Sequence, residues 1–166
     1  MSKLNPAADA IKLRDLYLTN AAGVPYLPVD PFSLAEAFNI PVYSTHLIAE
    51  SRLACINWDD DGAFIAINET LSYTQQRFAC ARVLGHFWDV EHNGRSKEFH
   101  NKDSTSVAYA NDFATALLMP ADLITQQFEK GVTNPDILAR IFRVSERSMR
   151  ARMTGLGLND ATSQSA

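Results

Sequence analysis

The middle of the chain reads as two strands followed by a long helix, and this order restricts the fold more than any other feature. Residues 53–58 and 63–68 are dominated by apolar side chains, and the Asp-Gly step between them is a strong signal for a β-hairpin. Ser72 is followed three positions later by Gln75, a pair typical of a helix N-terminus. The helix is predicted to run to about His92, where an Asn-Gly pair ends it.

Helical patterns cover most of the remaining chain, so the predicted fold class is α+β. A small sheet, antiparallel at its hairpin, would pack against several helices, and residues 40–43 are predicted to form a further strand. We predict a main domain over residues 1–130, C-terminal helices over residues 131–158 and a disordered tail over residues 159–166. Four further helices are predicted over residues 7–18, 30–38, 106–119 and 120–130. Another helix begins at Asn134. The last predicted helix is capped by Ser145 and ends near Gly155 or Gly157.

The composition is that of an ordinary globular protein, with 46% hydrophobic and 20% charged residues. The formal net charge of −4 argues against a protein that binds nucleic acid over its whole surface. No apolar run approaches the roughly 20 residues that a bilayer requires, and the first residues lack the apolar core of a signal peptide. Cys55 and Cys80 form neither a disulfide scaffold nor a CxxC motif. A cytoplasmic protein is expected.

Residues 77–86 of the long helix read Arg-Phe-Ala-Cys-Ala-Arg-Val-Leu-Gly-His and resemble the active-site helix of the ImmA/IrrE metallopeptidase family. In that family the corresponding run is Arg-Phe-x-x-Ala-His-Glu-Leu-Gly-His. Residues 110–120 resemble a second family signature, Ala-Asn-x-Phe-Ala-x-x-Leu-Leu-Met-Pro. The likeness extends over about residues 30–158. It implies a zincin-like core followed by C-terminal helices that are similar to a helix-turn-helix.

The chemistry of the family helix is missing from this chain. In a zincin, two His at i and i+4 hold zinc while the Glu between them activates a water molecule. Here Arg82 stands in the first His position and Val83 in the Glu position, so that only His86 remains. A guanidinium has no lone pair for a metal, and an isopropyl group is not a base. We therefore predict no catalytic residue and no cofactor, although zinc is the cofactor of the family. The positions at which the resemblance places the third ligand hold Val107, Ala108 and Tyr109.

A different metal site remains an open alternative. Asp89 lies three positions after His86 and shares its helix face. His100 and Asp103 follow in the next polar segment. Nitrogen and oxygen ligands of this kind are able to bind a divalent ion, so these four residues are candidates for the rebuilt site of a divergent hydrolase. No Ser-His-Asp or Cys-His arrangement can be argued from spacing.

The substrate cleft of an active relative would serve an inactive one as a docking groove for a peptide. We predict that residues 63–68 form an edge strand whose backbone pairs with an extended segment. If Arg82 points into the cleft, its burial requires a carboxylate or carbonyl partner; alternatively, it pairs with Asp89 or another local acid. The predicted groove residues are Ile65, Ile67, Asn68, Arg82 and His86.

Arginines near the C-terminus support an alternative in which the chain binds DNA. Arg143, Arg147 and Arg150 follow helical spacing, and one continuous helix would align them in a basic stripe. The predicted cap at Ser145 breaks this continuity. Two short helices around a turn are also the pattern of a helix-turn-helix, whose second helix contacts DNA.

The resemblance implies a regulatory role. Members of the ImmA/IrrE family typically act as proteases on helix-turn-helix repressors of mobile elements and stress responses, and related chains are encoded beside such repressors as toxin and antitoxin pairs. The main prediction is thus a catalytically inactive relative, or pseudopeptidase, that binds a protein partner of the helix-turn-helix class. The alternatives are a divergent metal-dependent hydrolase or peptidase and a DNA-binding regulator. No membrane partner is expected.

Overall fold

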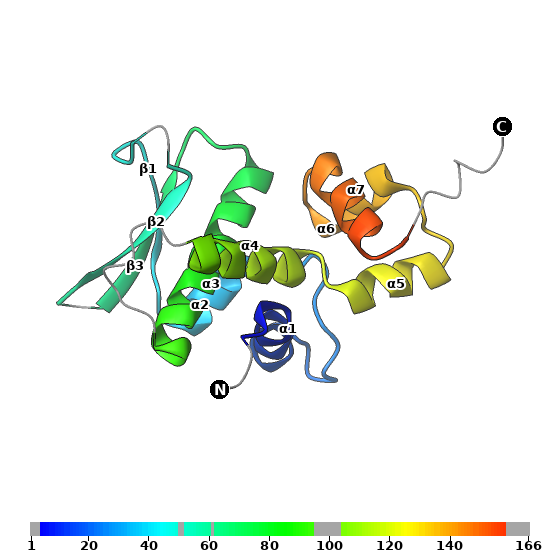
Figure 1. The fold of residues 1–166 in the computed structure, drawn as a ribbon, viewed down its shortest axis with the longest axis horizontal. Coiled ribbons are helices and arrows are strands. Elements are labelled where there is room, and N and C mark those ends of the chain that lie inside the picture. Colours follow the sequence, from blue (N-terminus) through cyan, green and yellow to red (C-terminus); the bar gives the residue numbers. More distant parts are fainter. Residues whose placement is uncertain (1–3, 50–51, 61, 95–103, 159–166) are drawn as a thin grey trace.

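A computed structural model describes residues 4–49, 52–60, 62–94 and 104–158 of the chain (Figure 1). It confirms the predicted α+β fold: the sheet forms one end of the molecule, the helices α1 to α4 pack in the middle, and α5 to α7 form the other end. None of the helices in these segments has the length and apolar character needed to cross a membrane. The elements are α1 (Pro6–Tyr17), α2 (Pro31–Ala37), β1 (Val42–Thr45), β2 (Ala54–Asp59), β3 (Gly62–Asn68), α3 (Tyr73–Asn93), α4 (Ser104–Leu118), α5 (Ala121–Glu129), α6 (Pro135–Phe142) and α7 (Glu146–Gly155).

The order of the sheet is β1-β3-β2, and this corrects one prediction. The hairpin β2–β3 is antiparallel as predicted, but β1 pairs with the other side of β3 in parallel. The Ile65 N–H, for example, donates to the Pro41 carbonyl at 2.9 Å. Residues 63–68 therefore form the central strand, and the prediction of an edge strand there is wrong. Because residues 65–68 are paired on both sides, their backbone offers no pairing groups to a peptide.

The core lies between the sheet and the layer of α3 and α4. Ile65 and Ile67 point from β3 into this core and are buried. The helices α3 and α4 approach closely at Gly85, because a Cβ placed there would lie 3.0 Å from the Phe113 side chain. Glycine at this position therefore serves the packing of two helices, which does not depend on zinc.

Two buried arginines join distant parts of the chain. Arg77 of α3 donates from its guanidinium to the carbonyls of Val29 at 2.6 Å and Arg143 at 3.1 Å. Arg14 of α1 contacts Asp122 of α5 at 2.8 Å. Burying a charged group is unfavourable unless it is paired and hydrogen-bonded, so these contacts fix the elements that supply the partners.

The C-terminal helices share the core of the main body. Phe142 of α6 and Met149 of α7 are fully buried in the same hydrophobic cluster as the residues of α3 and α4. The Arg152 Nε–H also donates to the Met119 carbonyl at 3.0 Å. The domain boundary near residue 130 stays a prediction, but residues on both sides of it pack in one core. The tail over residues 159–166 lies outside the described residues.

Candidate functional site

The face of α3 that corresponds to the family's zinc site carries Arg82, His86 and Asp89. Arg82 and His86 lie one helical turn apart on the same face, as their spacing predicts. Val83 instead points into the core, where it is 3% exposed. The helix is held in register at its start by a capping contact, in which the Ser72 N–H donates to Gln75 Oε1 at 2.9 Å. Gly94, with φ +69°, ends it.

Asp89 is the centre of a buried hydrogen-bond network between α3 and α4. Its carboxylate is fully buried and accepts from Asn93 Nδ2 at 2.8 Å and from the Ser106 hydroxyl at 3.2 Å. The Ser106 oxygen lies 3.3 Å from His86 Nδ1. Because Ser106 gives its one proton to Asp89, its oxygen accepts the Nδ1–H of a neutral His86. In this assignment the Nε2 atom of His86 keeps a free lone pair.

Ser106 was not among the candidate residues from the sequence. It lies in the first turn of α4, and it contacts α3 residues that are 17 and 20 positions away in the chain. The only signal in the sequence is that Ser106 directly precedes residues 107–109, where the resemblance places the third zinc ligand. This signal does not reveal which α3 residue the hydroxyl meets.

Two buried atoms of the site, Arg82 Nε and His86 Nε2, have no hydrogen-bond partner among the described residues. Burial lowers the pKa of the Arg82 guanidinium below its ordinary value. Burial also lowers the pKa of His86; the charge of Arg82 lowers it further, and Asp89 acts in the opposite direction. The site therefore combines a half-buried cation with a neutral imidazole, and the predicted ion pair between Arg82 and Asp89 does not form. Asp89 accepts hydrogen bonds from Asn93 and Ser106.

The described residues do not fit a zinc ion. The positive charge of Arg82 shares the helix face with His86 and repels a cation. Of the third-ligand positions, Val107 and Ala108 have no donor atom, and the Tyr109 hydroxyl donates to Asp9 at 2.6 Å. No group of three His, Cys, Asp or Glu in the described segments is arranged to hold a metal ion. His100 and Asp103 lie outside these segments, so the alternative site that includes them stays a hypothesis.

Three of the predicted groove residues are part of the interior. Ile65 and Ile67 are buried under the helices, and Asn68 is 5% exposed. The Asn68 side chain stabilises the link from β3 to α3, because its Oδ1 accepts from the Thr70 N–H at 3.0 Å. The described structure thus brings Arg82 and His86 together, but it does not place these three side chains beside them on an open surface.

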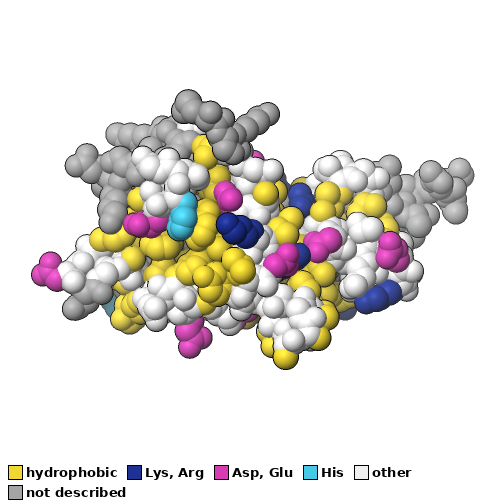
Figure 2. Space-filling view, turned by 90° about the horizontal axis from the view of Figure 1, so that it is seen from below, with side chains coloured by type: hydrophobic (Ala, Val, Ile, Leu, Met, Phe, Trp, Pro, Cys, Tyr) yellow, Lys and Arg dark blue, Asp and Glu magenta, His cyan; other side chains and the backbone are white. Residues whose placement is uncertain are grey.

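Of the arginines proposed to bind DNA, Arg143 follows the end of α6, and Arg147 and Arg150 lie in α7. Ser145 caps α7 through the Ser148 N–H at 3.1 Å, so the predicted break in the basic stripe is confirmed. Arg150 donates to Glu146 at 2.8 Å and to Asp136 at 3.0 Å, whereas Arg143 and Arg147 are exposed. On the face seen in Figure 2, basic side chains are scattered among acidic and hydrophobic ones and form no broad patch. Direct DNA binding stays a prediction.

The lowered pKa of His86 predicts a loss of stability in mild acid. The unfolded chain takes up a proton on His86 near the ordinary value of 6.5, whereas the folded protein does so only at lower pH. Between these two values the unfolded state binds more protons, so the free energy of unfolding falls as the pH falls. Urea unfolding of the wild type and of His86→Gln between about pH 7.5 and 5 measures this effect. The variant is expected to lose less stability across that range.

A matched control for this experiment is His46→Gln, because the His46 side chain is 75% exposed. This control should keep the pH dependence of the wild type. Equal slopes for the wild type and His86→Gln would show that His86 is not a buried neutral imidazole.

Comparison with known proteins identifies a family and several similar solved structures. Residues 35–154 match the family described as the IrrE N-terminal-like domain. Among solved structures, a Mycobacterium tuberculosis transcriptional regulator is similar, with a TM-score of 0.59 and 16% sequence identity. The match covers 91% of this chain and 52% of that one, so this chain spans about half the length of the regulator. At this identity the likeness concerns the fold alone. No curated protein matches the chain.

Proposed function

We propose, since the chain belongs to the family of IrrE N-terminal-like domains, that it is a catalytically inactive member that binds a protein partner through the former zinc site. The partner we propose is a regulator of the helix-turn-helix class, in a mobile-element, stress or toxin–antitoxin setting. The changes at Arg82 and Val83 remove the first metal ligand and the base together, while the helix that carried them keeps its packing. This combination favours a protein that still binds its partner but no longer hydrolyses it.

The observation that carries the proposal is the pair of unsatisfied atoms on α3. Arg82 Nε–H is a donor and His86 Nε2, in the tautomer that Ser106 favours, is an acceptor. A donor and an acceptor one turn apart complement a primary side-chain amide, or the N–H and C=O of one extended residue, because each of these presents a donor and an acceptor to the same side. Each buried polar atom without a partner costs about 1–3 kcal/mol. An amide that reaches both atoms, after the groups that cover them have moved, therefore gains affinity. The proposed ligand group is thus a backbone or side-chain amide of the partner.

The test is a binding measurement with a small helix-turn-helix regulator from the same genome as the probe. Titration calorimetry is expected to show a complex that Arg82→Gln and His86→Gln each weaken by about tenfold or more, since one lost hydrogen bond of about 1.4 kcal/mol corresponds to that factor. Lys130→Gln is the control, because Lys130 is exposed beyond α5 and should leave the affinity unchanged.

The same mixture distinguishes binding from hydrolysis. With added zinc, the partner should remain intact. Cleavage that requires zinc and disappears in His86→Ala would establish the hydrolase alternative and end the proposal. Absence of a complex with wild-type protein would also reject it.

A further inference from the structure

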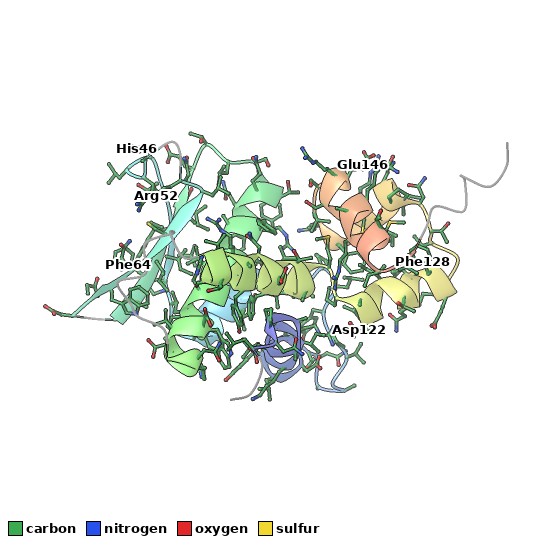
Figure 3. The ribbon with its side chains drawn as sticks, viewed as in Figure 1. His46, Arg52, Phe64, Asp122, Phe128 and Glu146 are labelled. Atoms are coloured by element: carbon green, nitrogen blue, oxygen red, sulfur yellow. The ribbon has the colours of Figure 1, made fainter. Side chains whose placement is uncertain are left out.

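A pocket of about 150 Å³ lies at the start of α3, beside residues of the sheet, of α4 and of the C-terminal helices. Its apolar walls come from four parts of the chain: Leu53 before β2, Phe78 of α3, Met119 after α4 and Val144 between α6 and α7. In the view of Figure 3, the start of α3 lies between the labelled residues Arg52 and Glu146, which are chain neighbours of two lining residues. A ligand in this pocket would thus contact the main body and the C-terminal helices together.

The pocket lies on the face of α3 that carries the candidate site. Gln75, Phe78, Arg82 and His86 follow one another at helical spacing and so form one stripe along the helix. Gln75 and Phe78 line the pocket, and Arg82 is one turn further along. Because the Cα–Cβ bonds of a helix tilt toward its N-terminus, the Arg82 side chain is directed toward the turn of Phe78. The pocket and the Arg82–His86 pair are therefore neighbours on the same strip of α3.

The pocket favours an apolar group. None of its described lining residues is charged. Its serine hydroxyls are already partnered, because the Ser145 oxygen accepts from the Ser148 N–H at 3.1 Å and lies 2.7 Å from the Ser148 hydroxyl. The Thr74 hydroxyl, also in the lining, lies 3.3 Å from that of Ser72. The lining therefore offers apolar contact, and none of these hydroxyls needs a ligand to complete its hydrogen bonds.

The volume of the pocket selects side chains of moderate size. An apolar cavity of about 150 Å³ holds a molecule of the size of benzene. A leucine side chain is smaller than benzene and fits, whereas the indole of tryptophan does not. Gln75 and Ser145 of the lining are exposed, so the pocket opens to solvent.

The distance along α3 fits the repeat of an extended peptide. Phe78 and Arg82 are separated by one turn, which is about 6 Å along the helix axis. In an extended peptide, side chains two positions apart point to the same side and are about 7 Å apart along the strand. A peptide that lies along this strip of α3 therefore places one side chain in the pocket and the next but one at Arg82 and His86.

We propose that the pocket receives a leucine-sized apolar side chain of the partner protein, two positions from an asparagine or glutamine whose side-chain amide meets Arg82 and His86. The inference deepens the proposed function and rests on it, because the same partner segment occupies both places. The apolar contact contributes binding free energy that offsets the movement needed to uncover Arg82 Nε and His86 Nε2.

The probe is an acetylated and amidated peptide, Leu-Thr-Gln-Thr-Leu. It carries leucine two positions from the glutamine on both sides, so that it fits in either chain direction. In ¹⁵N spectra of the full chain, titration is expected to shift the amide signals of Phe78, Arg82 and Ser148. The matched peptide with alanine in place of both leucines should bind about tenfold more weakly, since the additional carbons of leucine are no longer removed from water. Equal affinities for the two peptides would overturn the inference.

Filling the pocket should remove the preference for leucine. Ser148→Leu occupies the pocket from α7 and keeps the helix cap, because the Ser148 N–H that donates to Ser145 is unchanged. The leucine peptide should then bind no better than the alanine peptide, whose affinity stays as in the wild type. Ala151→Leu, on the exposed side of α7, is the control and should keep the preference. If Ser148→Leu fails to fold, Thr74→Leu fills the pocket from α3.

Arg82→Gln separates the inference from the proposed function. It is expected to weaken both peptides equally and to keep the preference for leucine. If it weakens both peptides but the wild type binds them equally, the inference fails and the proposed function stands. If it weakens neither peptide, both fail.

Three further results would reject the inference. The first is an absence of shifts at millimolar peptide. The second is a preference for leucine that survives in Ser148→Leu. The third is a shift of the Phe78 and Ser148 signals when the protein alone is diluted, which would show that a second copy of the chain fills the pocket.

Discussion

Arg77→Ala is expected to lower the free energy of unfolding by about 3–5 kcal/mol, the range found when one partner of a buried charged network is removed. The Arg77 side chain is 1% exposed and donates to carbonyls of the α1–α2 link and of the end of α6. Its NH1 atom also lies 3.6 Å from Asp30. Alanine leaves these carbonyls buried without a donor and opens a cavity, and both effects act against folding.

Urea unfolding followed by circular dichroism measures this loss. Arg77→Lys should recover only part of it, since one ammonium cannot reproduce the divergent donors of a guanidinium. Arg147→Ala is the surface control and should stay within about 0.5 kcal/mol of the wild type. A loss below about 1 kcal/mol in Arg77→Ala would show that these contacts do not hold the C-terminal helices to α3.

Gly85→Ala is expected to destabilise the protein by about 1–3 kcal/mol, although alanine is the better helix former by about 1 kcal/mol. The added methyl group would meet the Cβ, Cγ and Cδ1 atoms of Phe113 at 3.0 Å. Phe113 is fully buried, so its ring cannot swing into solvent to make room. The two helices must therefore separate, and the contacts around them weaken.

Gly155→Ala is the matched control, because a Cβ at this helical glycine meets nothing within 4 Å. It should be neutral or slightly stabilising. Adding Phe113→Leu to Gly85→Ala should restore part of the lost stability, and a double-mutant cycle measures that coupling. Strict additivity of the two substitutions would mean that the clash is relieved elsewhere.

Local sequence signals predicted the helices and strands well. They could not predict which distant segments pair with one another. The Asp-Gly turn predicted the β2–β3 hairpin, and Ser145 predicted the start of α7, because each signal acts within a few residues. The position of β3 in the sheet depends on Val42 pairing with Ile65, which are far apart in the chain. Alternating Ile65 and Ile67 show that one face is buried, but not whether the strand has one neighbour or two.

The candidate site shows the same division. Comparison with the family run identified the replacements at Arg82 and Val83 from sequence alone. The contact of His86 with Ser106, and so its tautomer, depends on how α4 packs against α3, which no spacing within either helix determines. The buried, unsatisfied Nε atom of Arg82 is likewise a property of the packed structure.

If the chain has lost hydrolysis as we propose, the way α3 is anchored explains how the fold persists without it. Its beginning is fixed by Arg77 and its middle by the close approach of Gly85 to Phe113, and neither anchor uses position 82 or 83. The contacts that hold this helix in the fold are thus separate from the residues that hydrolysis requires. Substitutions at positions 82 and 83 therefore leave both anchors in place, as the proposed inactive member requires.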